Sequence, residues 1–184
     1  MQMRQPADVR LLPGYTLIEL MLGLALLGIL LTWGVPNFID LYQRNLIATQ
    51  TQRLMGDLFH ARSEAIKRNK PVVICRSQDA SHCTPSSKSQ ADWSMGWITF
   101  VNEDEDKNRE PDEPVLRVGG SVPRQLSVQF NHWWRMTFRP NGRAGNGTFT
   151  LCDRARNEYR ITVYHSGRTR VSKTKAENST CPAP

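Results

Sequence analysis

The chain opens with one long apolar segment and continues as a mixture of polar and apolar positions. Residues 15–39 are nearly all apolar, and no charged side chain occurs between Leu20 and Ile39. About 20 apolar residues in a helix are enough to cross the hydrocarbon core of a bilayer. The pattern therefore predicts one membrane-spanning helix at 15–39, with a single carboxylate, Glu19, almost at its start.

Helical spacing continues beyond this segment, over 40–70. Hydrophobic or small side chains recur there at alternating intervals of four and three residues, which places them on one face of a helix. Basic residues and then Pro71 follow, as is typical of a helix C-terminus. We expect one helix from Tyr15 to about Arg68, on the order of 80 Å long, whose amphipathic second half packs on the remaining domain. The stripe consists of Ile47, Thr51, Leu54, Leu58, Ala61 and Ala65.

After Pro71 the pattern changes to short alternating runs, separated by turn sequences such as PNGRAGNG and HSGR. These runs predict a mainly antiparallel β-sheet, or a pair of sheets, packed on the helix. The fold class is therefore α+β, with a β-rich head at 71–184. The expected strands are 71–76, 95–101, 114–118, 126–131, 135–140, 147–152, 158–164 and 168–172.

The first 14 residues, 1–14, form a short basic leader. Arg4 and Arg10 outweigh Asp8 there, and positive residues that flank a span tend to stay in the cytoplasm. We therefore expect a single-pass protein of the bacterial inner membrane with its C-terminal head in the periplasm. A cleaved secretory signal would end in a small-x-small site after the apolar run. Because the run ends in TWGVPNF instead, we favour a helix that is retained.

The motif GYTLIE at 14–19, followed directly by the uncharged segment, resembles the class III signal of type IV pilins and type II secretion pseudopilins. The resemblance implies cleavage after Gly14 by a prepilin peptidase and N-methylation of the new first residue, Tyr15, by the same peptidase/N-methyltransferase. Tyr15 stands where Phe is usual, which keeps an aromatic ring.

Glu19 needs an explanation, because an isolated carboxylate in hydrocarbon is costly unless it is neutralised or paired. The pilin resemblance implies that it meets the free N-terminal amine of a neighbouring subunit and so directs assembly. The alternative is a carboxylate at headgroup level that only marks the end of the span. Pro36 is expected to kink or locally open the helix, as is common in pilin helices; a simple break before the head is the alternative.

Six segments of the head follow one another in a characteristic order. They are ARSEAIKRNKPVVIC (61–75), GWITFV (96–101), EPVLRV (113–118), FRPNGRA (138–144), TFTLCD (148–153) and GRTR (167–170). This order resembles the GspH/FimT family of minor pilins and pseudopilins over nearly the whole chain after the leader.

The four cysteines, Cys75, Cys83, Cys152 and Cys181, all lie in the part that is expected outside the membrane, where disulfides persist. Three pairings are open. We favour Cys75 with Cys83, which closes a small loop, and Cys152 with Cys181, which fastens the tail to a strand. Neither a C-x-x-C motif nor a Cys/His metal spacing occurs, so we expect no zinc and no cofactor.

Charge is distributed unevenly along the chain, whose net charge is +7. The segment 103–113 is strongly acidic. Asp104, Asp106 and Asn108 stand at alternate positions in it and suggest calcium ligands. However, Arg109 occupies the place where an EF-hand loop needs Gly, so we favour a solvated loop.

The last third of the chain is basic. If 168–172 is a strand, Arg168 and Arg170 point to one face, about 6–7 Å apart, a spacing that suits successive phosphates of a nucleic-acid strand. Lys173 and Lys175 are expected to extend this patch. Further candidates for this patch are Arg143, Arg154, Arg156 and Arg160.

The GRTR segment resembles the Gly-Arg-x-Arg motif of FimT-type minor pilins that bind DNA during natural transformation, which implies double-stranded DNA as a partner. A solvated basic strand, or one that contacts the acidic segment 103–113 of an adjacent subunit, is the alternative. Trp133 and Trp134 are candidates for stacking on bases or for core packing.

No catalytic constellation stands out, and the histidines at 60, 82, 132 and 165 are scattered, so the sequence favours a protein that is not an enzyme. The first hypothesis is a minor pilin or pseudopilin, with other pilins and an inner-membrane assembly platform as partners, that enters a type IV pilus or a type II secretion pseudopilus. The second adds DNA capture for uptake. The alternative is a pseudopilin like the type II secretion protein H, which acts in protein secretion without binding DNA.

Overall fold

A computed structural model describes residues 14, 16–85, 91–104, 109–132, 134–174 and 181. At positions 33 and 36 it describes the backbone alone. Tyr15, Trp133 and Lys175 therefore lie outside the described residues. The chain divides into two compact units, Met1–Leu41 and Tyr42–Pro184.

The long helix that the sequence predicts is confirmed as α1, Leu17–Arg68. Thr16 precedes it, and the Thr16 Oγ1 accepts a hydrogen bond from the backbone N–H of Glu19 (3.3 Å). This is the arrangement of an N-cap, which satisfies one of the free donors of the first turn. At the other end Lys67 and Arg68 occupy the last turn, and Asn69 takes a left-handed conformation (φ 54°) that stops the helix before Pro71.

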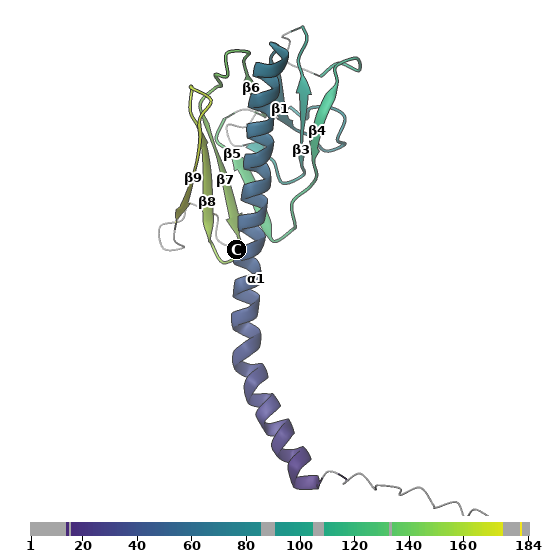
Figure 1. Ribbon diagram of the computed structural model, residues 1–184, viewed down its shortest axis with the longest axis vertical. Coiled ribbons are helices and arrows are strands. Elements are labelled where there is room, and N and C mark those ends of the chain that lie inside the picture. Colours follow the sequence, from purple (N-terminus) through teal and green to yellow (C-terminus); the bar gives the residue numbers. More distant parts are fainter. Residues whose placement is uncertain are drawn as a thin grey trace, which may run out of the picture. The chain divides into compact units, whose positions relative to one another are not determined.

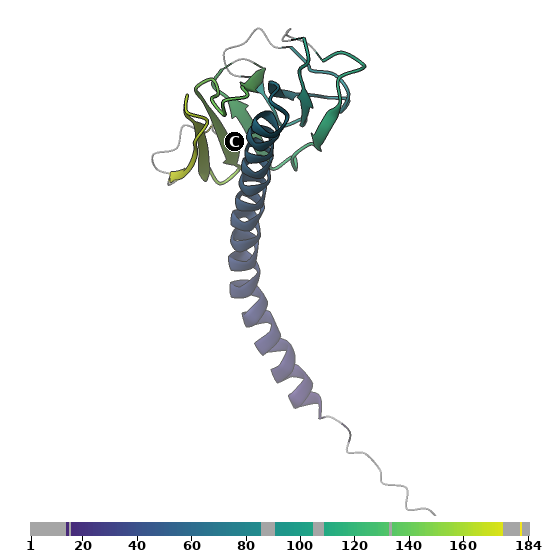
Figure 2. The ribbon, with the colours of Figure 1, turned by 45° about the horizontal axis from the view of Figure 1, so that its top comes forward.

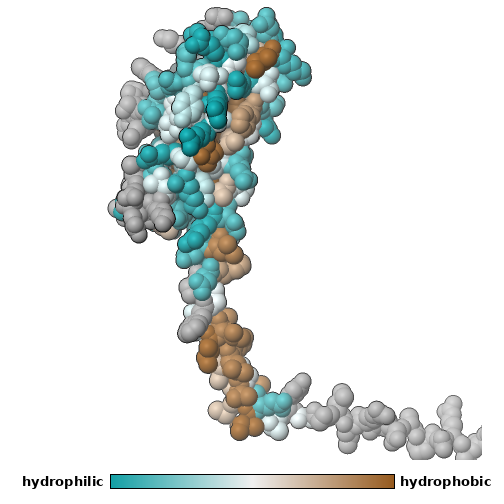
Figure 3. All heavy atoms as spheres, turned by 60° about the vertical axis from the view of Figure 1, so that its left-hand side comes forward, coloured by the Kyte–Doolittle hydropathy of each residue, from teal (hydrophilic) through white to brown (hydrophobic). Residues whose placement is uncertain are grey.

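Within the first unit, the part of α1 from Leu17 to Leu41 is long and apolar enough to cross a membrane. Its large aliphatic side chains are exposed, and Figure 3 shows this stretch as a nearly continuous apolar surface. Exposed apolar side chains in such number require a bilayer or a protein partner. Pro36 lies inside α1.

The second unit contains two antiparallel sheets. The four-stranded sheet has the order β4-β3-β1-β6, with β1 Val72–Arg76, β3 Trp97–Val101, β4 Val115–Gly119 and β6 Arg135–Phe138. The five-stranded sheet has the order β2-β5-β7-β8-β9, with β2 Ala91–Asp92, β5 Leu126–Phe130, β7 Gly147–Asp153, β8 Glu158–Val163 and β9 Thr169–Thr174. The α+β fold class is confirmed, and each of the eight expected strands is present; the short β2 was not predicted.

The second half of α1 lies between the two sheets, with the five-stranded sheet on one side and the four-stranded sheet on the other (Figures 1 and 2). The predicted stripe is the buried face of this half, since its six side chains are at most 2% exposed. Trp93, Phe130 and Phe149 form an aromatic cluster beneath the five-stranded sheet, with ring centroids 4.2–5.6 Å apart. Burial of these apolar faces is the main source of the head's stability.

Two disulfides fasten the ends of the head. Cys75 is bonded to Cys83, eight residues away, and Cys152 to Cys181, 29 residues away. This is the favoured one of the three pairings that the sequence left open. The second disulfide holds position 181 against the end of β7.

Candidate functional site

The start of α1 presents the acid that the sequence singles out. Glu19 lies in the first turn, is exposed, and stands at the third helical position after the cap Thr16. A negative side chain is favourable there because it faces the positive end of the helix dipole. Glu19, Leu20, Gly23, Leu24 and Leu27 line a shallow, almost wholly apolar notch on the helix surface. The carboxylate therefore adjoins a surface into which another apolar side chain can pack.

The Thr-x-x-Glu pattern at 16–19 is also the signature of a capping box. This signal is present in the motif itself and could have predicted where α1 begins. Thr16 thus fixes where α1 begins, and Glu19 is carried on an ordered first turn. Of the two expected processing positions, the structure describes only the cleavage position: Gly14 is exposed, whereas Tyr15, the expected methylation position, lies outside the described residues.

The GRTR segment forms the turn between β8 and β9 and the start of β9. The Gly167 N–H donates to the Tyr164 carbonyl (2.7 Å), and the Tyr164 N–H donates to the Arg168 carbonyl (2.9 Å). Gly167 has φ +73°, and a Cβ added to it would overlap the carbonyl oxygen of Gly142. The glycine of this motif is therefore required by packing as well as by backbone conformation.

Gly142 belongs to the PNGR turn at 140–143 and also has a positive φ, +75°. Arg62 of α1 joins the helix to the β8–β9 turn, because its Nη2 donates a hydrogen bond to the Ser166 carbonyl (3.2 Å). Each of the two touching glycines is followed by an exposed arginine, Arg143 and Arg168. Two segments that are far apart in the sequence thus bring their arginines to the same end of the head.

The strand register decides which cations share a face. Arg170 lies opposite Thr162, and Arg160 lies opposite Ser172. Directly opposed residues point to the same side of a sheet and alternate residues return to it, so Arg160 and Arg170 share one face, about 7–8 Å apart on the diagonal. Arg168 precedes Arg170 by two positions and is exposed. Arg160 also forms an ion pair with the buried Glu158.

This face of the five-stranded sheet is mostly polar. The register also places the disulfide-bonded Cys152 and the buried Glu158 on it, but its other side chains in β5, β7, β8 and β9 carry hydroxyl, amide or guanidinium groups. The Thr148 and Thr162 hydroxyls lie 3.3 Å apart across two neighbouring strands. The exposed acid among the described strand positions of this face is Asp92 of β2, which lies opposite Gln129, whereas Glu158 is buried. The side chains with hydroxyl, amide or guanidinium groups on this face of the four longer strands are Ser127, Gln129, Thr148, Thr150, Arg160, Thr162, Arg170, Ser172 and Thr174.

The expectation that Lys173 extends the arginine pair needs correction. Lys173 lies opposite Tyr159 in the β8–β9 register, and its ammonium is 5.3 Å from the Tyr159 ring centroid. Because side chains alternate along a strand, Lys173 points to the other face from Arg170. Arg154 and Arg156 lie at the β7–β8 turn, the far end of that hairpin from Gly147 and Val163. The register therefore brings Arg160 and Arg170 together, with the exposed Arg168 just before β9.

The described residues of the acidic segment 103–113 are held together by hydrogen bonds to Glu113. The buried Glu113 carboxylate accepts hydrogen bonds from the backbone N–H groups of Glu103 (2.7 Å) and Glu110 (3.0 Å). The Arg109 guanidinium donates to the Glu113 carbonyl (2.8 Å) and to the Ser81 carbonyl (3.0 Å) in the disulfide loop. Asp104 is exposed, whereas Asp106 and Asn108, the other suggested calcium ligands, lie outside the described residues.

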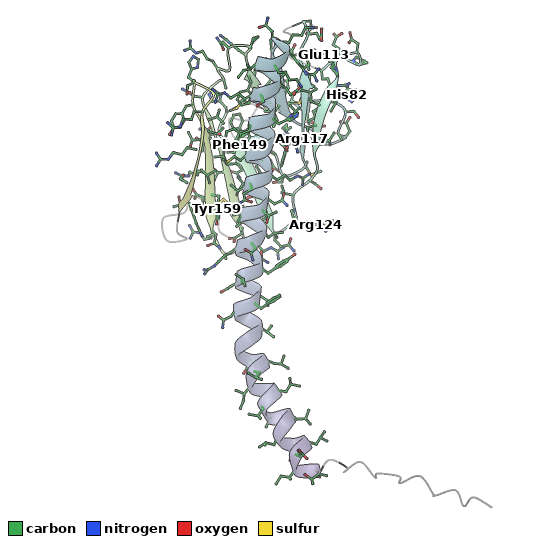
Figure 4. The ribbon with its side chains drawn as sticks, in the orientation of Figure 1. His82, Glu113, Arg117, Arg124, Phe149 and Tyr159 are labelled. Atoms are coloured by element: carbon green, nitrogen blue, oxygen red, sulfur yellow. A yellow bond between two sulfur atoms is a disulfide. The ribbon has the colours of Figure 1, made fainter. Side chains whose placement is uncertain are left out.

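The disulfide loop beside it is organised by another carboxylate. Asp79 accepts hydrogen bonds from the backbone N–H groups of His82 (2.8 Å) and Ser81 (2.9 Å), and its other oxygen contacts the His82 ring (2.8 Å). The His82 donors, first the backbone and then the ring, hold the pKa of Asp79 well below its ordinary value of 3.8. His82 and Glu113 lie at the same end of the head (Figure 4). Trp134, one of the two stacking candidates, is buried.

Comparison with known proteins gives a family match. The sequence model of the family described as type II transport protein GspH matches residues 50–167. No curated protein matches the chain significantly.

Two solved structures share the fold. Type IV minor pilin FimU of Pseudomonas aeruginosa is 18% identical, with a TM-score of 0.51 over 74% of this chain and 93% of that one. Minor pseudopilin EpsH of the Vibrio cholerae type 2 secretion system is 10% identical, with a TM-score of 0.50 over 70% of this chain and 97% of that one.

Proposed function

Because the chain belongs to the family of the type II transport protein GspH, we propose that it is a minor pilin or pseudopilin. It assembles with other such subunits into a type IV pilus or a type II secretion pseudopilus. The fold it shares with FimU and EpsH supports this structural role. The apolar part of α1 anchors the protein in the inner membrane before assembly, with the head in the periplasm, and later lies in the filament.

The observation that carries this proposal is the exposed carboxylate of Glu19 on an otherwise uncharged apolar helix surface. In hydrocarbon this charge is unfavourable unless a cation approaches it. Cleavage after Gly14 by the prepilin peptidase would free an amine at Tyr15 of each subunit, which is then methylated. Pairing of that amine with Glu19 of a neighbour stabilises the assembled state over the single subunit in the membrane, where the assembly platform receives it.

The test compares two carboxylates on α1. Glu19→Gln removes the acid from the apolar surface, and Asp40→Asn, the matched control, removes the next acid along the helix, just after the apolar run. Incorporation is measured as the fraction of the protein in sheared, purified filaments relative to the membrane fraction. We expect Glu19→Gln to insert into the membrane normally while incorporation falls at least tenfold, and Asp40→Asn to assemble as the parent does. Normal incorporation of Glu19→Gln would contradict the docking role.

A second function is supported by a separate observation: Arg160 and Arg170 lie on one mostly polar face of the five-stranded sheet, and the exposed Arg168 precedes Arg170 by two positions, just before β9. A guanidinium group binds two phosphate oxygens in a bidentate manner, and neighbouring hydroxyl groups supply additional hydrogen-bond donors to phosphate. Such a face contacts the backbone of double-stranded DNA and does not read its bases. On this proposal the subunit captures DNA at the filament for uptake.

DNA capture is tested with the full chain in detergent micelles and a fluorescent duplex at low salt. Arg168→Gln/Arg170→Gln should weaken binding at least tenfold. Arg154→Gln/Arg156→Gln removes the same charge from the far end of the β7–β8 hairpin and should weaken binding less than threefold. Absence of binding by the parent would reject DNA capture and favour a pseudopilin that acts in secretion alone, without touching the assembly proposal.

A further inference from the structure

The cations of the β7–β8 turn belong to a larger basic group at one end of the five-stranded sheet. Leu126 at the start of β5 pairs with Asp153 at the end of β7, so Arg124, two positions before Leu126, lies at the same end of the sheet as the turn. Lys173, near the end of β9, pairs with Tyr159 at the start of β8 and is brought to this end as well. We call this group the basic end of the head; it consists of the exposed Arg124, Arg154 and Lys173 and the half-buried Arg156.

The acids that adjoin the basic end are used inside the fold. Asp153 is buried and accepts hydrogen bonds from the backbone N–H (2.8 Å) and the side-chain amide (2.7 Å) of Asn157. Glu158 is fully buried and forms an ion pair with Arg160. The turns and strand ends that carry the cations contain no acid at all, so this end presents positive charge to its surroundings. These segments are 122–126, 154–157 and 172–174.

The basic end is the end of the head at which α1 enters it. Arg62, late in α1, donates to the Ser166 carbonyl in the β8–β9 turn, so the β7–β8 turn lies further back along the helix. Figures 1 and 2 show β7, β8 and β9 running alongside this half of α1. The length of β8, about 17 Å, equals about eleven residues of helix. Figure 4 accordingly places Tyr159 and Arg124 at the lower end of the head, towards its first residue, Tyr42.

Chain connectivity brings this end close to a lipid surface. The apolar run ends at Ile39, and Tyr42 follows three positions later in the same helix, about 4.5 Å further along its axis. The headgroup layer of a bilayer is about 5–7 Å thick on each side. When the run spans a membrane, the exposed Tyr42 and Arg44 therefore lie at headgroup depth, where aromatic rings and cations are favourable. Asp40, four positions before Arg44, offsets one positive charge.

We propose that the basic end of the head rests on the anionic phospholipid headgroups of the membrane in which α1 is anchored. The negative potential of such a surface acts over one Debye length, about 8 Å at physiological salt. The guanidinium groups of Arg124 and Arg154 bind lipid phosphates, and the Lys173 ammonium adds a further charge. The contact belongs to the anchored subunit and is lost when α1 leaves the bilayer. Anionic lipid thus holds the subunit in the membrane until a filament takes it up.

The arrangement of the cations favours a lipid surface over a nucleic acid at this end. Arg170 lies on one face of the sheet, whereas Lys173 points to the other and adjoins Tyr159. The basic end therefore carries charge around the tip of the sheet and not along one of its faces. A plane of mobile headgroups can meet such a tip from all sides at once, whereas a duplex follows a single face. The inference rests on the membrane anchoring proposed above, and on neither assembly nor DNA capture.

The test uses the full chain, with both disulfides formed, in lipid nanodiscs. One added thiol carries a dye, either at the basic end (Ala155→Cys) or in the opposite turn of the β8 hairpin (His165→Cys); both positions are exposed. A nitroxide on the lipid headgroup quenches the dye at short range only. We expect quenching at position 155 to rise at least threefold when phosphatidylglycerol replaces part of the phosphatidylcholine, and to fall back at high salt. Quenching at position 165 should not change.

Two double variants with the same change in charge locate the effect. Arg124→Gln/Arg154→Gln should reduce the gain in quenching at position 155 at least threefold. Arg139→Gln/Arg143→Gln is the matched control, because it removes two exposed cations beside the turn that packs on Gly167, at the other end of the head, and should leave the gain nearly unchanged. Co-elution of the chain with the nanodisc measures anchoring separately, so a failure to insert is distinguished from a head that does not touch the lipid.

Three results would overturn the proposal. Equal quenching at position 155 in neutral and anionic nanodiscs would show that charge does not bring this end to the lipid. Equal losses in the two double variants would reduce the effect to net charge. Release of the dye by a short DNA duplex at a lower phosphate concentration than that of the lipid would assign the basic end to nucleic acid. Should Arg124→Gln/Arg154→Gln fail to fold, the lipid and salt dependence of the parent at positions 155 and 165 still decides.

Discussion

Gly167 packs directly against the carbonyl oxygen of Gly142, a residue 25 positions earlier in the chain. Both glycines have a positive φ, and each begins a Gly-Arg pair. The segments FRPNGRA and GRTR, two of those that carry the family resemblance, are thus the two halves of one tertiary contact on α1. Their glycines hold the turns together, and their arginines are presented at the surface.

The contact predicts that Gly167→Ala is strongly destabilising. Alanine at φ +73° is strained, and its Cβ would overlap the Gly142 carbonyl, so the two turns must separate. We expect a loss of about 2–4 kcal/mol in the free energy of unfolding, measured by urea unfolding with near-UV circular dichroism. Gly145→Ala is the matched control and should change stability by less than about 0.5 kcal/mol. Equal effects at the two positions would contradict the packing role.

A buried carboxylate on α1 gives the next prediction. Asp57 accepts a hydrogen bond from Trp97 Nε1 (2.8 Å) and forms an ion pair with Arg117 (3.1 Å), which is half exposed. Asp57→Ala leaves the buried Trp97 N–H without its acceptor, and we expect a loss of about 3 kcal/mol. Arg117→Gln should cost about 1 kcal/mol, because solvent screens that partner.

The same urea unfolding measurement checks both variants. The order of the two losses is the informative result, since it separates the buried hydrogen bond from the partly exposed ion pair. If Arg117→Gln were as damaging as Asp57→Ala, the carboxylate would act mainly through its charge, and the role given to Trp97 would be wrong.

Much of the fold follows from residue spacing. The 4-3 recurrence from Ile47 to Ala65 identifies the buried face of α1 because a helix repeats every 3.6 residues. Eight strands were visible as alternating runs between turns. β2 was missed because Ala91–Asp92 is only two residues long and has no alternation to detect. Its pairing with β5 is set by tertiary contacts that the local sequence does not encode.

The site was less accessible from the sequence. The contact of Gly167 with Gly142 and the approach of Arg62 to the turn depend on how distant segments meet, so no local pattern shows them. The face of Lys173, by contrast, was predictable: it lies three positions after Arg170, and an odd interval in a strand leads to the opposite side. Arg160 was one of four further arginines that the sequence offered for the patch, and only the register between β8 and β9 places it beside Arg170.

Asp79 gives a prediction about pH. Its pKa is lowered in the folded protein, chiefly by the backbone and ring donors of His82. A carboxyl whose pKa is lower when folded stabilises the fold above its unfolded pKa, near 3.8, and this stabilisation is lost as the pH falls below that value. Carbon-detected NMR of the Asp79 carboxyl should therefore show a titration midpoint below 3.8.

Two variants distinguish the effect of the His82 ring on the Asp79 pKa from the effect of the backbone N–H donors. His82→Ala removes the ring contact and should raise the Asp79 midpoint towards its ordinary value, although the backbone donors remain. Ser81→Ala is the control, because Ser81 donates to Asp79 through its backbone N–H (2.9 Å), which alanine keeps. A midpoint that moves as far in Ser81→Ala as in His82→Ala would show that the loop backbone, and not the ring, responds to the change.

The last prediction concerns the salt dependence of DNA binding. Each phosphate contact releases condensed counterions, so the slope of log K against log salt changes by about 0.9 for each contact removed. Arg168→Gln/Arg170→Gln should therefore flatten the slope by about two. Lys173→Gln should leave it nearly unchanged, since Lys173 lies on the opposite face beside Tyr159. Duplex titrations of the full chain between low and moderate salt measure both slopes. Equal flattening by Lys173→Gln would mean that DNA follows the edge of β9 and not the polar face of the sheet, and the arrangement of Arg160, Arg168 and Arg170 would then have no bearing on DNA.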